Sequence, residues 1–304
     1  MEKTYQRSIR AFRPYLDVTV FIAAVVLMAS AAGAQNLFVS AFQYTIPFSP
    51  SSSIVEITPG GSMSIFASGL GEPFGPAFDS AGNLYEADYY SGNIYKFTPA
   101  GVQSVFASGL NVPVALAFNS ADELFEADCY SGNIYGFAPD GTRTTFASGL
   151  LNPCSLAFNS AGNLFVGDQG GGNIYEFTPN GTRSTFASGL QSLYALDFDS
   201  AGNLYEADGS SGNIYKFTPV GTRTTFASGL NSPDALVFDN SGNLYAADLS
   251  GNVYKFAPDG TRSTFISGLS IPQGLAFEPA PEPPNLAFLA LGGAAFIYLC
   301  RRER

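Results

Sequence analysis

The sequence predicts an all-β fold, a six-bladed β-propeller of four-stranded blades, and three observations lead to this prediction. The pentapeptide Phe-Ala-Ser-Gly-Leu recurs at a spacing of about 40 residues, a period typical of propeller blades and of paired-helix repeats. Glycine and proline interrupt every longer run, which excludes the helical alternative. The first and last repeats are incomplete in complementary ways, which indicates that the chain closes into a ring.

Each repeat unit divides into four short strands separated by turns. In the unit 73–110, the expected strands are residues 75–78, 84–88, 94–97 and 104–107, with Gly-Asn or Pro-Gly turns between them. The repeated pentapeptide that closes each unit starts at Phe66, Phe106, Phe146, Phe186 and Phe226, with a sixth variant at Phe265.

The two ends of the array supply one shared blade. Residues 36–38, 53–57 and 62–66 are expected to form its second to fourth strands, and residues 272–277 form a lone first strand. Pairing the two ends removes the open edge that a linear array would leave. The predicted propeller domain is 35–278.

The unit resembles the NHL repeat, and it is similar to the repeats of the gluconolactonase/regucalcin and virginiamycin B lyase propellers. The resemblance extends over residues 36–278 and is carried by strings such as Leu116-Ala117-Phe118-Asn119 and Leu124-Phe125-Glu126-Ala127-Asp128. It implies the six-bladed fold and says little about activity, because one propeller fold carries many functions.

Composition excludes several kinds of chemistry. The chain has no histidine, so imidazole metal ligands and histidine-dependent nucleophiles are absent. The net charge of −11 disfavours nucleic acid as a partner.

Residues 1–34 have the order of a signal peptide: basic residues, an apolar run at 18–28, and Ala32-Gly33-Ala34. Cleavage is expected between Ala34 and Gln35. The alternative is an uncleaved membrane anchor, although the apolar run is shorter than the roughly 20 residues that a spanning helix needs.

Residues 279–304 combine a proline-rich spacer, an apolar transmembrane segment and an arginine cluster. The spacer contains Pro281, Glu282 and Pro283. This order resembles the PEP-CTERM sorting signal of Gram-negative bacteria. The resemblance implies export across the inner membrane, transient membrane anchoring, cleavage by an exosortase-type enzyme, and release to the cell surface or the extracellular space. A permanent tail anchor is the alternative.

Residues repeated in every blade are expected to serve the blade. The aspartates that end each second strand are predicted to accept backbone N–H bonds from the following turn; a ring of Ca²⁺ ligands is the alternative. These residues are Asp88, Asp128, Asp168, Asp208 and Asp248. The arginines of the outermost strands are expected to be solvated edge charges, at Arg143, Arg183, Arg223 and Arg262.

A binding site is expected where the repeat varies, on the face formed by the loops that lead into the first strands and out of the second strands. A predicted longer loop at 39–52 adds further aromatic residues to this face. Relaxed packing is the alternative explanation of the variation. The candidate residues for a polysaccharide or surface-protein ligand are Phe74, Tyr89, Tyr130, Gln169, Tyr194, Asp234, Gln273 and Tyr44.

The resemblance to gluconolactonases also implies a way to test for catalysis. That family holds a divalent metal with a Glu, an Asn and an Asp, and only Asp234 matches this set. Phe74 stands at the place of the Glu, with Glu72 two residues earlier, and Cys154 or Tyr194 at the place of the Asn. The resemblance to virginiamycin-type lyases implies catalysis that depends on histidine, which this chain lacks.

The sequence therefore favours a non-enzymatic surface or matrix protein without a cofactor. The alternative is a metal-dependent lactonase-like hydrolase that uses Asp234, Gln273 and a divalent ion such as Ca²⁺.

Two cysteines remain after the predicted processing, Cys129 and Cys154. The blade prediction places them in loops of adjacent blades on the variable face. Export permits a disulfide between them, and two free thiols are the alternative.

Overall fold

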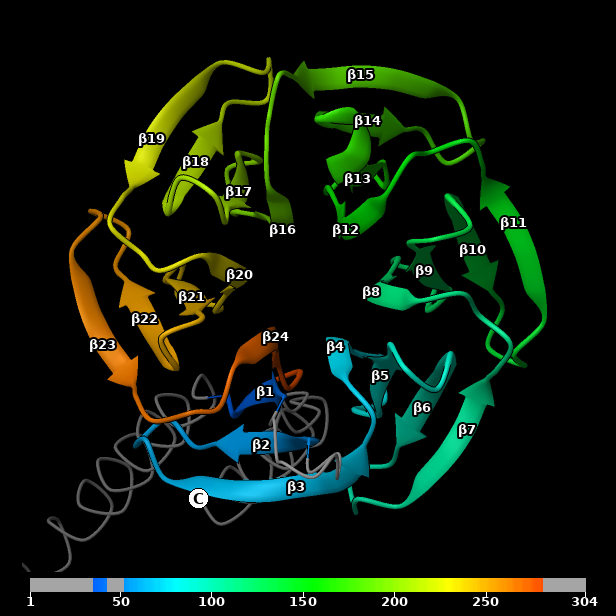
Figure 1. Cartoon of the computed structure of the whole chain (residues 1–304), viewed down its shortest axis with the longest axis horizontal. Helices are drawn as coiled ribbons and strands as arrows, with labels where there is room; N and C mark the ends of the chain where they lie inside the picture. The colour runs from blue at the N-terminus through cyan, green and yellow to red at the C-terminus, as the bar shows by residue number, and fades with distance from the viewer. Residues whose placement is uncertain (1–34, 43–51, 281–304) are drawn as a thin grey trace, which may run out of the picture. The chain divides into compact units, whose positions relative to one another are not determined.

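The computed structural model describes residues 35–42 and 52–280, which belong to one compact unit, Gln35–Pro279. Six four-stranded antiparallel sheets form a ring in this unit (Figure 1). The predicted six-bladed β-propeller is therefore confirmed. The predicted signal peptide with Ala34, the Pro281, Glu282 and Pro283 of the predicted sorting tail, and the loop residue Tyr44 lie outside the described residues.

Five blades are built from consecutive strands that run from the centre of the ring to its rim. The first two are β4 (Pro73–Phe78), β5 (Leu84–Asp88), β6 (Asn93–Phe97), β7 (Gln103–Ala107), and β8 (Pro113–Phe118), β9 (Leu124–Asp128), β10 (Asn133–Phe137), β11 (Arg143–Ala147). The third is β12 (Pro153–Phe158), β13 (Leu164–Asp168), β14 (Asn173–Phe177), β15 (Arg183–Ser188), with the short 3₁₀ helix η1 (Gln169–Gly171). The fourth and fifth are β16 (Leu193–Phe198), β17 (Leu204–Asp208), β18 (Asn213–Phe217), β19 (Arg223–Ala227), and β20 (Pro233–Phe238), β21 (Leu244–Asp248), β22 (Asn252–Phe256), β23 (Arg262–Ile266).

The sixth blade joins the two ends of the array, as the sequence predicts. Its order is β24–β1–β2–β3, with strands β24 (Pro272–Phe277), β1 (Leu37–Ala41), β2 (Ser52–Ile57) and β3 (Met63–Leu70). Strand β1 pairs antiparallel with β24 and with β2, so it is hydrogen-bonded along both edges. Among the described helices, none is long and apolar enough to cross a membrane.

Strand β1 is longer than expected, because residues 39–41 were assigned to the following loop. Val39 pairs with Val55 on one side and with Leu275 on the other, and its side chain is fully buried. Pairing on both edges and burial together hold the strand as far as Ala41. The prediction that the loop begins at Val39 was wrong.

Aromatic side chains lock each blade to the next. Phe125 of β9 meets Phe146 of its own blade edge to face at 5.1 Å, and Phe158 of the following blade at 5.1 Å. The same three-ring cluster recurs around the ring, for example at Tyr205 with Phe226 and Phe238. The phenylalanine of the repeated pentapeptide therefore belongs to the contact between blades, where edge-to-face pairs add to the burial of apolar surface.

The repeated aspartates tie the blades together at their turns. The carboxylate of Asp128 accepts the Ser131 N–H at 3.2 Å, within its own turn, and the Asn111 N–H at 2.7 Å, in the connection from the preceding blade. The predicted turn contact is confirmed, and the second bond explains why the residue recurs. The arginines of the outermost strands are exposed, as predicted, and they also stack on tyrosines: Arg143 lies 4.9 Å from the ring centre of Tyr135.

Candidate ligand-binding site

Every innermost strand carries a β-bulge immediately after its first residue. In β4 the pairing passes from Pro73 with Asp88 to Gly75 with Ala87, so Phe74 has no partner in the ladder. A bulge re-aims the side chain of the extra residue. The bulged residues of the six strands are those that the sequence marked as variable: Phe74, Val114, Cys154, Tyr194, Asp234 and Gln273.

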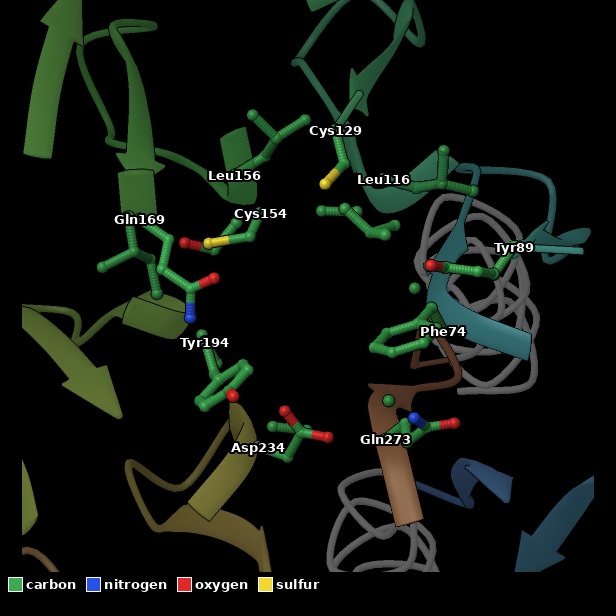
Figure 2. A pocket seen from close by; sticks show the side chains of 18 of the residues that line it. Phe74, Tyr89, Leu116, Cys129, Cys154, Leu156, Gln169, Tyr194, Asp234 and Gln273 are labelled. Carbon is green, nitrogen blue, oxygen red and sulfur yellow. The ribbon is translucent and has the colours of Figure 1, made fainter. Parts of the chain in front are cut away.

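The six bulged residues line one cavity of about 320 Å³ at the centre of the ring, here called the central cavity (Figure 2). Tyr89, Tyr130 and Gln169 complete its wall. Seven of the eight candidate residues are thus brought together, and Tyr44 lies outside the described residues. A second cavity lies at the opposite mouth of the ring. Six apolar residues of the inner strands line both cavities and separate one from the other: Pro76, Leu116, Leu156, Leu196, Leu236 and Leu275.

Asp234 is an acid without a partner in this cavity. Within residues 35–42 and 52–280, its carboxylate makes neither a hydrogen bond nor an ion pair. Burial raises the pKa of Asp234 to about 7, and the nearby charge of Glu72 adds to the rise. The carboxylate points into the open space opposite Phe74 (Figure 2).

Asp197, which lines the opposite cavity, is an acid whose carboxylate has hydrogen-bond donors. Its carboxylate accepts the Phe198 N–H at 2.8 Å and the Phe238 N–H at 2.7 Å, which joins adjacent blades. Burial raises the pKa of Asp197 to about 6, and the two backbone bonds act against that rise. Asp197 has a structural role, and Asp234 has no equivalent contacts.

Glu72, which was not among the candidate site residues, holds the Gln273 side chain in one orientation. The Gln273 side-chain NH₂ donates to Glu72 at 3.3 Å. Because a carboxylate only accepts, the amide oxygen of Gln273 must face elsewhere, and that oxygen is buried without a hydrogen-bond donor. Burial raises the pKa of Glu72, while the bonds from Gln273 and Tyr90 lower it. No residue pattern in the sequence links Glu72 to Gln273, since they lie 201 positions apart.

Aromatic rings cover one side of the cavity. The ring centres of Phe74 and Tyr89 are 5.8 Å apart, and the hydroxyl oxygens of Tyr89 and Tyr130 are 3.4 Å apart. The bond to Tyr130, with burial adding to it, raises the pKa of Tyr89 to about 12. Tyr194 lies against Gly209, where an added Cβ atom would come within 2.2 Å of its ring. Glycine at 209 therefore makes room for the tyrosine.

Cys129 and Cys154 both line the central cavity, as the sequence predicts for that face. Both thiols are free in this structure, so the disulfide expected between them is not formed here. The Cys129 thiol donates to the side-chain oxygen of Asn152 at 2.7 Å, and the Cys154 thiol donates to the carbonyl oxygen of Leu193 at 2.6 Å. Burial raises the pKa of both thiols, that of Cys129 to about 11, so neither is an activated nucleophile.

The metal set implied by the gluconolactonase resemblance is not assembled by the described residues. Nowhere in these ranges do three acidic, cysteine or histidine side chains come together as metal ligands. Phe74 occupies the place of the expected Glu, and Glu72 bonds to Gln273 without lining the cavity. Asp234 is the one matching ligand, and a single carboxylate does not make a divalent-metal site.

Comparison with known proteins supports the fold. No protein-family model and no curated protein matches the chain. A chain of a nidogen/laminin complex is 20% identical with a TM-score of 0.70, over 82% of this chain and 99% of that one. A gluconolactonase from Xanthomonas campestris is 17% identical with a TM-score of 0.59, over 72% and 89%. Virginiamycin B lyase from Staphylococcus aureus is 14% identical with a TM-score of 0.59, over 81% and 96%. At these identities the likeness supports the β-propeller fold and says nothing about activity.

Proposed function

We propose that the chain is an exported, non-enzymatic propeller that acts as a binding or scaffold protein at the cell surface or in the extracellular matrix. One observation carries the proposal. The positions at which the repeat varies coincide with the bulged residues around the central cavity, so variation is concentrated at the place where a ligand would contact the protein. The aromatic wall suits a polysaccharide or a surface protein.

The proposed location rests on the targeting signals predicted at the two termini. The leader 1–34 and the PEP-CTERM-like tail 279–304 are the basis for proposing export across the inner membrane, transient anchoring and exosortase processing. One structural neighbour is a chain of a nidogen/laminin complex, which is consistent with a binding role for this fold.

Binding can be measured by thermal shift of the full-length chain against a panel of soluble polysaccharides, with Gly209→Ala as the site variant. The added methyl group displaces Tyr194, so we expect a ligand-induced shift in the unaltered chain and a smaller one in the variant. Gly202→Ala, in a turn away from the cavity, is the control. Absence of a shift with every ligand would leave no support for a binding role.

A lactonase-like hydrolase is the second candidate, because Asp234 combines the position of the family's Asp with a pKa of about 7, which suits a general base. Turnover of simple lactones that is abolished by EDTA and by Asp234→Ala would establish it. Lack of turnover with added divalent ions would remove it.

A further inference from the structure

The central cavity contains one acceptor without a donor. The Asp234 carboxylate has no hydrogen bond among the described residues. Asp234 is the bulged residue of the inner strand β20, and its carboxylate points into the cavity (Figure 2). A largely buried carboxylate without a donor is costly, so a ligand that supplies N–H donors and positive charge would gain most here.

The protein does not supply that charge itself. No lysine or arginine lines the central cavity. All seven basic side chains of the described residues instead lie over tyrosine rings in the outer parts of the blades, with three lysines also near acids. Glu72, which does not line the cavity, adds to the negative potential at Asp234.

The wall determines the kind of cation. One carboxylate balances one positive charge, and the described residues contain no three-ligand cluster for a divalent metal. The ring faces of Phe74 and Tyr89, together with the leucines that separate the two cavities, provide apolar surface that an inorganic ion would not use. Aromatic faces beside a carboxylate are suited to an organic ammonium group.

We propose that the central cavity binds a protonated primary amine, with Asp234 as its counter-ion and Phe74 and Tyr89 against its carbon skeleton. The proposal rests on the proposed binding function and names the chemistry of its ligand. A polysaccharide that contains amino sugars and a partner protein that inserts a lysine share this ammonium group, and the two sources are separated by the probes below.

The test is calorimetric titration of the full-length chain with two matched pairs of probes at about pH 7.5, where aliphatic amines are protonated. The first pair is glucosamine and N-acetylglucosamine, and the second is Nα-acetyl-lysine amide and the same compound acetylated at Nε. We expect at least one amine to bind and its acetylated partner to bind at least about tenfold more weakly, because acetylation removes the charge that pairs with the carboxylate. Binding of the lysine compound alone would support the ammonium site and favour a protein partner.

The variant that isolates Asp234 is Asp234→Asn, which removes the charge and keeps the shape. It is expected to fold, since the carboxylate has no contact that the fold needs, and to lose at least about tenfold in amine affinity. Glu123→Gln, an exposed change of the same charge, is the control and should bind normally. Equal binding of amine and acetylated probes, or full affinity in Asp234→Asn, would overturn the inference and leave the binding function standing. Failure of all four probes together with the polysaccharide panel would remove both.

Discussion

Three glutamates in the middle of second strands are completely buried: Glu86, Glu126 and Glu206. They differ in their partners. Glu86 accepts the Ser40 hydroxyl at 2.8 Å, and Ser40 comes from the blade that closes the ring. The carboxyl oxygens of Glu126 and Glu206 have no hydrogen bond within the described residues. Burial raises the pKa of Glu126 to about 9 and that of Glu206 to about 8, so both hold a proton at neutral pH.

Replacement of Glu126 by glutamine should stabilise the protein at alkaline pH. The folded state keeps the Glu126 proton up to about pH 9, whereas the unfolded chain releases it near its ordinary value of 4.5. Between these values the folded state binds more protons, so the free energy of unfolding falls as pH rises. Glu126→Gln cannot ionise, and because one pKa unit corresponds to about 1.4 kcal/mol, it should gain several kcal/mol over the unaltered chain at about pH 8 and little at about pH 4.

Urea unfolding of the two proteins at both pH values measures this difference, with Glu123→Gln as the exposed control. A stability difference for Glu126→Gln that is the same at both pH values would contradict it, because the effect is expected to come from ionisation alone.

At the scale of the element, two of the repeated glycines have positive φ in different surroundings. Gly149, in the repeated pentapeptide, has φ 74° and open space around the position of a Cβ atom. Gly132, in the second turn, has φ 67°, and a Cβ atom there would come within 2.2 Å of the Leu150 carbonyl oxygen. The Leu150 N–H also donates to the Gly132 carbonyl at 3.1 Å, so the turn is fastened to the end of the pentapeptide.

These two glycines give a matched pair of variants. Gly149→Ala should lower the free energy of unfolding by about 1 kcal/mol, the cost of positive φ for a residue with a Cβ atom. Gly132→Ala should lower it by at least about 2 kcal/mol more, because the methyl group collides with backbone and disturbs the bond to Leu150. Chemical denaturation measures both, and equal losses would show that the close approach at Gly132 relaxes at little cost.

The sequence predicts the repeated parts of this fold well, because each repeated residue has a local reason for its identity. The turn glycines and the Asp128 turn contact follow from spacing and turn chemistry alone. Contacts between blades could not be predicted from the sequence in the same way. The bond between Gln273 and Glu72 joins the closing strand to the first complete blade. Within one blade, the stacking of Arg143 on Tyr135 was not predicted either, because it depends on the register of two strands. The variable positions were found, but only the structure shows that a bulge turns each of them into the cavity.

At the scale of the whole molecule, strand β24 is the element on which ring closure depends. It pairs along β1, and its Leu275 belongs to the apolar cluster that also contains Leu37 and Val39 of the same blade and Tyr245 of the adjoining blade. It also brings Phe277 to 5.0 Å from Tyr245. Without β24, strand β1 becomes an open edge and two blades lose their shared core.

A chain ending after Ser270 should therefore lose several kcal/mol of stability, unfold in a broader transition and fail to bind any ligand of the central cavity, since Gln273 and Leu275 are removed. A chain ending after Ala280 retains all 24 strands and should match the full-length chain in its unfolding transition. Thermal unfolding followed by far-ultraviolet circular dichroism distinguishes the two truncations. A single sharp transition at an unchanged midpoint after removal of β24 would show that the five continuous blades close without the shared one. In that case the pairing of β1 with β24 would complete the ligand cavity without determining the stability of the ring.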